Sequence, residues 1–421
     1  MIVAEGLRIM KRTSPNDLCV EVICLPEMIA AQKALLRNAG LLAYRAKFES
    51  WKVVGSNAKL AYSTHGLFRF FGKFPPLIPR KLIEDYTVKG QLVADPMCGS
   101  GTTALEALSL ERRVAVNDIS PLSLLLVRVK TKHVPLLESG KAFARVSARY
   151  LKAKAPKEFI LPELKDPYHW FERDTLVSLS KIKDAIDQEP AGPLRDLLKV
   201  AFLSTVRRVS KATTQQGRLF LDVTTAEKDA WPTFETRFHK YARSVAELEA
   251  YNREEDLTIT SKDIRVLDYG QNSPQLIIMH PPYFNNYKYS SINTLELAWM
   301  GVSRKAIREV ELREAFKVGK VEKVVEYVQD VIAAVRSQAA VIPKGGVIAL
   351  MMGDTIIREK YVNATRMVLE GIAKETPMLV LTKVVLRVPQ HTEASWVASQ
   401  RRKAKSIGVT LNDFILIFKK R

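Results

Sequence analysis

Hydrophobic residues in this chain occur in short continuous runs that alternate with stretches in which they recur every three or four positions. Short apolar runs bounded by turn residues are typical of buried strands, and the longer spacing is typical of amphipathic helices. Strands are therefore predicted at Leu92–Ala94, Arg113–Asp118, Leu276–Met279 and Val347–Met352, and helices from Thr102, at Leu122–Lys132 and at Lys320–Val341. Leu379–Leu386 and Phe414–Phe418 form a predicted closing antiparallel pair. This order predicts an α/β fold with a doubly wound, mostly parallel sheet.

The middle of the chain departs from this alternation. From residue 136 to residue 260 the strand signal fades, the spacing becomes helical and the connections contain prolines. We therefore predict a helical insertion at 136–260 that interrupts one α/β domain formed by 61–135 and 261–421. An N-terminal extension at 1–60 precedes this domain, with a possible strand at Cys19–Cys24. The core pattern resumes at Lys262–Leu267, which is predicted to be a short strand.

The stretch Val93–Thr103, VADPMCGSGTT, joins a buried strand to a helix through a glycine-rich turn. Gly99 and Gly101 allow a tight turn that exposes backbone N–H groups at a helix N-terminus. A P-loop requires Gly-Lys-Ser/Thr after its glycines and a dinucleotide fingerprint requires G-x-G-x-x-G, and the stretch contains neither. The run D-P-x-x-G-S-G-T-T instead resembles the cofactor motif of the amino-group DNA methyltransferases, the N4-cytosine and N6-adenine methylases that use S-adenosylmethionine.

This resemblance implies a Rossmann-like methyltransferase fold and a cofactor site around the glycine turn. In that family a Lys/Phe-Pro segment upstream packs beside the methionine end of the cofactor, and an Asp before a later segment reaches the adenine amino group. Asp118 is well placed to accept hydrogen bonds from the ribose hydroxyls, or alternatively to cap the helix that starts at Ser120. The predicted cofactor residues are Lys73, Phe74, Pro75, Asp95, Pro96, Met97, Cys98, Gly99, Ser100, Gly101, Thr102, Thr103, Asp118, Ile119, Asp263 and Ile264.

The second motif, His280-Pro281-Pro282-Tyr283, follows the predicted strand Leu276–Met279. Two consecutive prolines cannot donate to a sheet ladder, so the strand must end there. In the resembled family this motif is Asp/Asn/Ser-Pro-Pro-aromatic. Its first side chain and first proline carbonyl accept hydrogen bonds from the target NH₂ group, and the aromatic ring stacks on the flipped base. The resemblance therefore makes His280, Pro281, Pro282 and Tyr283 the expected catalytic residues.

His280 departs from the family pattern. A neutral imidazole still offers one acceptor nitrogen, so methyl transfer is expected to weaken as the pH falls through a histidine pKa of about 6.5. The stretches Asn285-Asn286-Tyr287 and Leu295-Glu296-Leu297 resemble a Ser-Pro-Pro-Tyr subgroup that generally acts on N4 of cytosine. Methylation at C5 of cytosine would require a Pro-Cys dipeptide, which this chain does not contain.

Charge narrows the choice of partner. The 421 residues include 65 Lys and Arg against 45 Asp and Glu, a net charge of +20 that favours a polyanion such as nucleic acid. A membrane surface is the other candidate, but no apolar run reaches transmembrane length and the start lacks the hydrophobic core of a signal peptide. A cytoplasmic location is expected. The three cysteines have no paired spacing, which indicates a reducing compartment and no zinc or other metal site.

Basic and amide side chains follow the apolar positions of a helix predicted at Arg195–Ser210. These residue types hold phosphates and read base edges, although charges at a helix end are also often merely solvated. The residues predicted to contact duplex DNA are Arg207, Arg208, Lys211, Gln215, Gln216, Arg218, Asn285, Asn286 and Lys288.

We therefore expect a restriction–modification type DNA methyltransferase that acts on an exocyclic amino group, with a preference for N4 of cytosine. The insertion at 136–260 is the expected target-recognition region, and a cognate endonuclease is a further expected partner. N6-adenine DNA methylation, RNA amino-methylation and a non-catalytic nucleic-acid-binding protein are the alternatives, the last suggested only by His280.

Overall fold

The computed structural model describes residues 18–56, 58–161, 164–215, 218–222, 224, 228–248, 254–270, 272–284, 289–312, 321–357, 360–387 and 409–421. Its strands are β1 (Cys19–Cys24), β2 (Lys47–Val54), β3 (Leu92–Asp95), β4 (Arg113–Asn117), β5 (Ala212–Gln215), β6 (Arg218–Leu221), β7 (Leu257–Thr260), β8 (Leu276–Met279), β9 (Val347–Ile357), β10 (Lys360–Val362), β11 (Leu379–Arg387) and β12 (Val409–Lys420). Its α-helices are α1 (Ala30–Asn38), α2 (Leu77–Tyr86), α3 (Thr102–Ser109), α4 (Pro121–Thr131), α5 (Leu136–Lys152), α6 (Arg173–Asp187), α7 (Pro193–Val209), α8 (Ala230–Ala246), α9 (Tyr289–Ile292), α10 (Thr294–Trp299), α11 (Arg304–Val310), α12 (Val324–Val341) and α13 (Ala364–Glu375).

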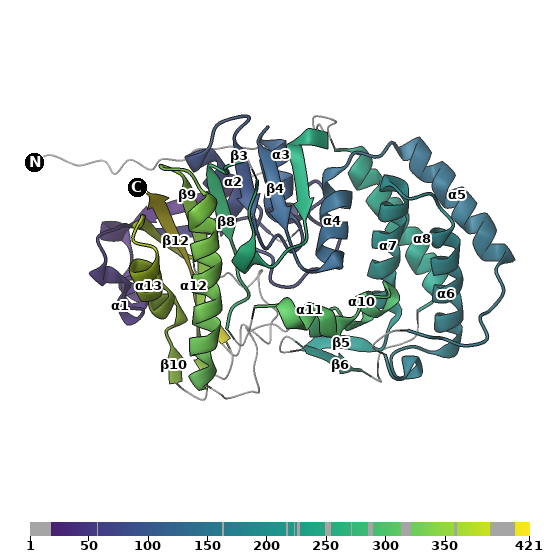
Figure 1. Cartoon of the computed structure of the whole chain (residues 1–421). Coiled ribbons are helices and arrows are strands. Elements are labelled where there is room, and N and C mark those ends of the chain that lie inside the picture. The colour runs from purple at the N-terminus through teal and green to yellow at the C-terminus, as the bar shows by residue number, and fades with distance from the viewer. Residues whose placement is uncertain are drawn as a thin grey trace, which may run out of the picture.

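One large sheet organises the described part of the chain, in the order β1-β2-β11-β12-β9-β8-β3-β4-β7, with β10 paired to β9 (Figure 1). The strands from β9 through β8, β3 and β4 to β7 run parallel to one another. β12 pairs antiparallel with both β11 and β9. The doubly wound, mostly parallel Rossmann-like sheet and its antiparallel closing pair were both predicted from the sequence, and the structure confirms them.

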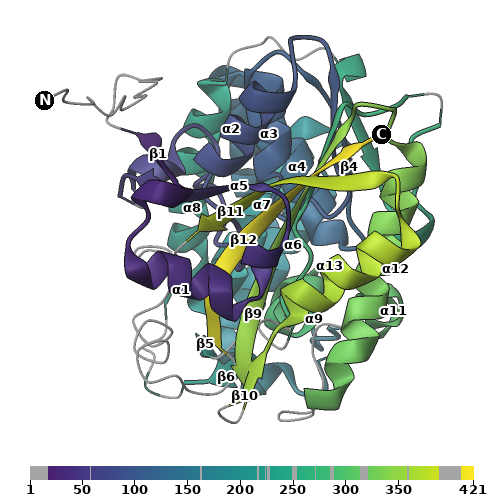
Figure 2. The same ribbon diagram turned by 90° about the vertical axis from the view of Figure 1, so that its left-hand side faces the viewer.

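Helices cover both faces of this sheet because its strands are apolar on both sides. Side chains of α1, α12 and α13 pack on one face, against Ile277 and Met279 of β8 among others. Side chains of α2 and α3 pack on the opposite face, against the alternate residues Leu276 and Ile278. Figure 2 shows α12 and α13 lying side by side across the sheet. The period-two alternation of a strand thus places successive residues of β8 in two separate cores.

The predicted N-terminal extension contributes strands to this sheet. β1 and β2 form an antiparallel pair, and β2 then pairs in parallel with β11, from Lys47 opposite Lys383 to Trp51 opposite Arg387. These pairings extend the sheet beyond its closing strands.

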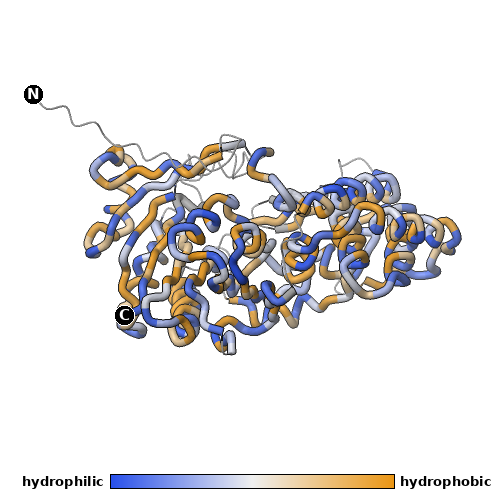
Figure 3. Tube along the Cα trace, turned by 90° about the horizontal axis from the view of Figure 1, so that it is seen from above, coloured by the Kyte–Doolittle hydropathy of each residue, from blue (hydrophilic) through white to orange (hydrophobic). Residues whose placement is uncertain are grey.

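The segment 136–260 holds α5, α6, α7 and α8, which pack together beside α4 and form the right-hand part of Figure 1. Hydrophobic and hydrophilic residues alternate along these helices (Figure 3), as their amphipathic spacing requires. The segment also contains an antiparallel hairpin, β5 with β6, that helical spacing alone did not predict. Its last strand, β7, belongs to the main sheet, where it pairs with β4.

The prediction of a strand at Lys262–Leu267 was wrong. The strand in this region is β7, and the chain leaves the sheet before Ile264–Val266, which form a single 3₁₀ turn. Asp263 caps this turn, since its carboxylate accepts a hydrogen bond from the Arg265 backbone N–H at 2.9 Å. In the described part of the chain, none of the helices combines the length and the apolar character needed to span a membrane.

Candidate cofactor and base cleft

The glycine turn begins at the carboxyl end of β3, where Asp95 is buried. One oxygen of its carboxylate accepts a hydrogen bond from the Met97 backbone N–H at 3.2 Å, which fixes the first bend of the turn. Burial raises the pKa of Asp95 to about 7, and the nearby Asp118 carboxylate raises it further. Asp95 therefore stabilises the turn through its hydrogen bond to the Met97 backbone.

Two glycines adopt left-handed backbone conformations, with φ of 48° at Gly99 and 76° at Gly101. A Cβ atom at Gly101 would lie 2.9 Å from the Val127 side chain and 3.3 Å from its Cα atom on α4. Gly101 is therefore required by both its backbone angle and its packing against α4. This packing fixes the position of the N-terminus of α3, which begins directly after Gly101.

Asp118 follows β4 and holds the glycine turn from the side. Its two carboxylate oxygens accept hydrogen bonds from the backbone N–H groups of Gly99, at 2.9 Å, and Ser120, at 2.8 Å. Burial raises its pKa. Asp118 thus binds the backbone where α4 begins and also lines the cleft described below. Both roles predicted for it, capping this helix and binding the ribose hydroxyls, are therefore compatible with the geometry.

The side chain of Asn117 joins this turn to the segment after β7. Its amide nitrogen donates to the carbonyl oxygens of Pro96, at 3.1 Å, and Lys262, at 2.9 Å. Its amide oxygen accepts a hydrogen bond from the Lys262 backbone N–H at 2.8 Å. Asn117 therefore positions Lys262 and Ile264 along the cleft.

The second motif begins where β8 ends, at Met279. β8 pairs in parallel with β3, so the carboxyl ends of the two strands meet at the same edge of the sheet. The His280 ring makes edge contacts with the rings of Phe74 and Tyr283, with centroids 5.0 and 5.2 Å apart. Burial lowers the pKa of His280 to about 3, and the positive charge of Arg387 lowers it further. The expectation of a histidine pKa of about 6.5 was therefore wrong, and His280 is neutral at physiological pH.

Both motifs open into one cleft. Its lining includes these predicted residues: Lys73, Phe74, Pro96, Met97, Cys98, Gly99, Ser100, Thr102, Asp118, Ile119, Ile264, His280 and Pro282. The remaining predicted cofactor and catalytic residues lie outside this lining: Pro75, Asp95, Gly101, Thr103, Asp263, Pro281 and Tyr283. Asp263 is engaged elsewhere, since its carboxylate makes a close ion pair with the Arg265 guanidinium at 2.6 Å.

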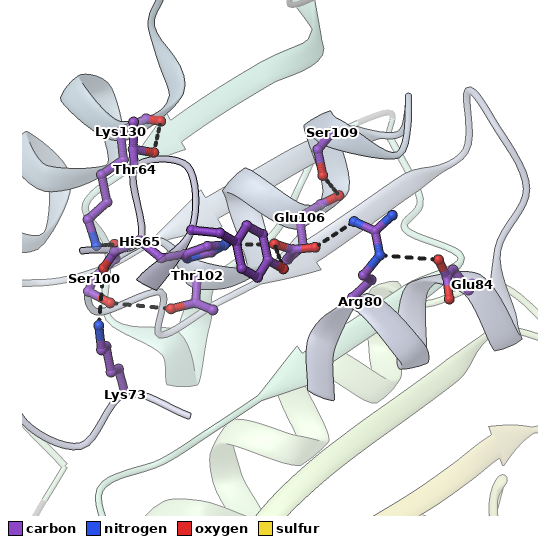
Figure 4. A network of polar contacts seen from close by, with 11 residues as sticks. Thr64, His65, Lys73, Arg80, Glu84, Ser100, Thr102, Glu106, Ser109 and Lys130 are labelled. Carbon is purple, nitrogen blue, oxygen red and sulfur yellow. Dashed lines mark hydrogen bonds and ion pairs between the residues drawn. The ribbon is translucent and has the colours of Figure 1, made fainter. Parts of the chain in front are cut away.

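A buried polar network fixes the segment that carries Lys73 (Figure 4). The Glu106 carboxylate on α3 binds the His65 ring at 2.7 Å, the Tyr62 hydroxyl at 2.7 Å and the Arg80 guanidinium at 3.1 Å. Burial alone would raise the pKa of Glu106, but these partners, His65 foremost, lower it below its usual range. The network ties α2 and the preceding loop to α3.

Two lysine ammonium groups converge beside this network (Figure 4). Lys73 donates to the carbonyl oxygen of His65 at 3.1 Å, and Lys130 on α4 donates to the carbonyl oxygen of Ser100 at 2.9 Å. Burial lowers the pKa of Lys130 to about 7, with a further contribution from the charge of Lys73. Lys130 thus holds the glycine turn from the side opposite to Asp118.

The residues predicted to contact DNA lie in different environments. Arg207 is 17% exposed and pairs with Glu296 of α10, which sequence reasoning did not anticipate. Lys211 pairs with Glu172 at 3.1 Å, and Arg208 is exposed to solvent. Gln215 and Arg218 are paired positions of the β5–β6 hairpin. Gln216, Asn285, Asn286 and Lys288 lie outside the described residues.

Sequence reasoning missed one wall of the cleft. This wall comes from α9, α10, α11 and the residues beside them: Tyr289, Ser290, Asn293, Leu297, Ile307, Val310, Glu311 and Leu312. Their spacing indicates only helices. Leu297 lies in the Leu295-Glu296-Leu297 stretch of the resembled subgroup, but it was not predicted to line the site. Phe70, Gly72, Asn117, Ser120, Ser123 and Lys262 were missed as well, although each lies close in sequence to a predicted residue.

The cleft fits the predicted cofactor in shape and chemistry. A Cβ atom at Gly72 would collide with the Tyr289 hydroxyl, and one at Gly99 would lie 3.2 Å from the Phe70 ring. Glycine at both positions keeps this part of the cleft free of additional side-chain atoms. Apolar side chains such as Ile119 and Met97, together with the carboxylate of Asp118, line the same space. This combination suits a ligand that has both an aromatic base and hydroxyl groups.

Comparison with known proteins agrees with this geometry. The profile of the N6/N4 methyltransferase family, described as DNA methylase, matches residues 43–128, which include the glycine turn. The type II methyltransferase M.MvaI of Kocuria varians is 23% identical over 262 residues, covering 56% of this chain and 57% of the relative. The type II methyltransferase M.BsoBI of Geobacillus stearothermophilus is 27% identical over 297 residues, covering 63% of this chain and 57% of the relative. The chain thus spans little more than half the length of either relative.

Solved structures resemble the chain only distantly. TrmN from Thermus thermophilus has a TM-score of 0.33 at 13% identity, covering 83% of this chain and 50% of that one. The rRNA methyltransferase AviRa from Streptomyces viridochromogenes has a TM-score of 0.30 at 13% identity, covering 72% and 84%. The family profile and the two sequence relatives agree with the motifs in the cleft, and in these features the chain is similar to the amino-group DNA methyltransferases.

Proposed function

We propose that this chain transfers a methyl group from S-adenosylmethionine, the cofactor of the family it resembles, to an exocyclic amino group in duplex DNA, with N4 of cytosine as the target. The observation that carries this proposal is the joining of two motifs in one cleft. β3 and β8 are neighbouring parallel strands, so the glycine turn and the His-Pro-Pro-Tyr segment open into the same space. The names of both sequence relatives, type II methyltransferases, support the choice of DNA.

The cofactor supplies an electrophilic methyl group bound to a sulfonium. The protein must then make the target nitrogen nucleophilic, because its lone pair is delocalised into the base. We assign His280 as the acceptor of one hydrogen bond from the amino group and the carbonyl oxygen of Pro281 as the acceptor of a second. A pKa of about 3 keeps the His280 ring neutral and able to accept. Tyr283 stacks on the flipped base in this proposal.

The remaining residues of the cleft hold the cofactor in this proposal. Asp118 lines the cleft and accepts a hydrogen bond from a ribose hydroxyl through the lone pair that its bonds to Gly99, Ser120 and Ser123 leave free. Lys73 lines the cleft and offers a cation to the carboxylate of the methionine moiety. Desolvation lowers the pKa of this ammonium, and a bound carboxylate would favour its charged form.

We assign the segment 136–260 as the target-recognition region. Its helices pack together beside α4. The insertion contacts the cleft wall at two places: α7 contacts α10, and the β5–β6 hairpin contacts α9. Through these two contacts, an insertion that binds DNA would be connected to the wall of the cleft. A cognate endonuclease remains an expected partner for an enzyme of this type.

The test is transfer of labelled methyl groups from S-adenosylmethionine into a mixed-sequence DNA duplex, followed by mass analysis of the nucleosides. N4-methylcytosine is the expected product, and His280→Ala is expected to abolish most of the incorporation while it retains cofactor affinity. N6-methyladenine would overturn the choice of base. Label that enters transfer RNA or ribosomal RNA and not duplex DNA would overturn the choice of substrate.

A further inference from the structure

Glu311 is a carboxylate in the cleft to which neither of the two motifs assigns a role. It follows α11, and its backbone N–H donates to the Ile307 carbonyl oxygen at 3.0 Å, which continues the last turn of that helix. One carboxylate oxygen of Glu311 accepts a hydrogen bond from the Ser290 hydroxyl of α9 at 3.0 Å. Both residues line the cleft. The Glu311 carboxylate is therefore held in place at the wall that sequence reasoning missed.

Glu311 and Asp118 place two carboxylates in one cleft, on segments that are far apart in the chain. Both carboxylates line the cleft, and burial raises the pKa of Glu311, with the Asp118 charge as a smaller contribution in the same direction. Among the described residues, no ion pair joins either carboxylate to a cation. Two half-buried negative charges that line the same cleft are stabilised when a positive charge enters it.

Two cationic side chains among the described residues, Lys73 and Lys262, also line the cleft. Lys73 donates to the His65 carbonyl oxygen, Lys262 lies 3.9 Å from the Asp268 carboxylate, and His280 is neutral. Arg308 on α11 partly offsets the charge of Glu311. The space between Glu311 and Asp118 is therefore suited to a positively charged ligand.

We propose that Glu311 makes the cleft selective for the positively charged methyl donor over the uncharged sulfur of the product. This inference rests on the proposed function. S-Adenosylmethionine carries a sulfonium charge, whereas S-adenosylhomocysteine has lost it together with the methyl group. A fixed carboxylate in the cleft stabilises the first ligand and has little effect on the second, so the charge of Glu311 favours binding of the donor and release of the product.

The experiment is calorimetric titration of the free protein, without DNA, with three ligands. These are S-adenosylmethionine, S-adenosylhomocysteine and sinefungin, an analogue with an ammonium group in place of the methylated sulfur. Glu311→Gln removes the charge and retains the shape of the side chain. Glu309→Gln removes an equal charge from an exposed position on the same helix and is the matched control.

In Glu311→Gln, the affinities for the donor and for sinefungin should fall by about three- to fifteenfold, the effect of two charges about 10 Å apart at an effective dielectric constant of about 20 with screening. The affinity for S-adenosylhomocysteine should stay unchanged, and Glu309→Gln should bind all three ligands as the parent does. Glu311→Asp should restore the preference for the cationic ligands.

Equal losses for the donor and the product in Glu311→Gln would show that the residue shapes the cleft without selecting charge, and would overturn the inference. If Glu311→Gln proves unfolded by its melting curve, Ser290→Ala provides the second test. It retains the carboxylate and removes the hydrogen bond that holds it in place, so the preference for the cationic ligands should weaken, and an unchanged preference would overturn the inference. A parent protein that binds none of the three ligands would overturn the proposed function itself.

Discussion

Arg207 on α7 forms a two-pronged ion pair with Glu296 on α10, with nitrogen–oxygen distances of 2.8 and 3.0 Å. Glu296 is 2% exposed, and the Arg207 guanidinium also donates to the Ile292 carbonyl oxygen. The helix that carries Glu296 also presents Leu297 to the cleft. This pair therefore fixes one wall of the cleft to the helical insertion, which gives Arg207 a structural role.

Replacing Arg207 by Met should lower the free energy of unfolding by about 3 kcal/mol, because the buried Glu296 carboxylate loses its partner. The double variant Arg207→Met/Glu296→Met should be less destabilised, since it leaves no unpaired charge. Urea unfolding followed by circular dichroism measures both. The control is Arg208→Ala, at an exposed neighbouring position, which should remain within about 0.5 kcal/mol of the parent. An Arg207→Met variant as stable as that control would contradict a structural role for the pair.

Arg208 is exposed at the end of the same helix, where a DNA phosphate can reach it. Arg208→Ala should weaken duplex binding and reduce the slope of log K against log salt by about 1, because one fewer counterion is released. Fluorescence anisotropy of a labelled duplex at several salt concentrations measures the slope. An unchanged slope would show that Arg208 is merely solvated at the helix end.

The pH dependence of methylation should show no contribution from His280 in the physiological range. A depressed pKa of about 3 means that the ring is already neutral at all higher pH values, so its acceptor nitrogen is available throughout. Single-turnover rates of the parent and of His280→Ser should therefore have the same pH profile between about pH 5.5 and 8. A loss of rate near pH 6.5 that is present in the parent and absent from His280→Ser would show that the ring titrates normally.

Gly99 and Gly90 offer a matched pair of substitutions. Both have left-handed backbones, with φ of 48° and 78°, but Gly99 lines the cleft and Gly90 has open space around it. Valine costs backbone strain of about 1–2 kcal/mol at either position, so stability should fall in both variants. Only Gly99→Val should also lose affinity for S-adenosylmethionine, by more than about tenfold, as measured by calorimetric titration. Equal affinities in the two variants would exclude Gly99 from the cofactor site.

Lys130 should make the fold more stable as the pH rises. Its pKa falls from 10.5 to about 7 on folding, so between these values the unfolded chain binds more protons than the native protein. Over this interval the parent should gain on the order of 2–4 kcal/mol of unfolding free energy relative to Lys130→Met. Denaturation at pH 7, 8, 9 and 10 gives the difference, and two parallel curves would show that Lys130 is protonated in the folded state at every pH tested.

The sequence by itself determined the central strands of the sheet and the chemistry carried by contiguous residues, whereas β5, β6 and β7 were not predicted from it. Leu276–Met279 is a strand with the predicted bounds because four apolar residues precede two prolines that cannot continue a ladder. The turn at Gly99-Ser100-Gly101 was predictable for a similar reason, since left-handed backbone angles favour glycine. The closing pair of β11 and β12 was also predicted correctly from its apolar runs.

The tertiary structure decided which side chains line the same cleft and how burial and neighbouring charges shift their pKa values. Nothing near Glu311 or Ser290 in the chain indicates that they lie in one cleft with Asp118, because that proximity arises from crossovers between distant elements. Arg207 follows an amphipathic pattern typical of a solvated helix end, yet packing against α10 buries it beside Glu296. The pKa of His280 likewise depends on burial and on Arg387, which is 107 positions away in the chain (387 − 280). Local pattern fixes backbone conformation, whereas desolvation and pairing depend on residues that only the folded chain brings together.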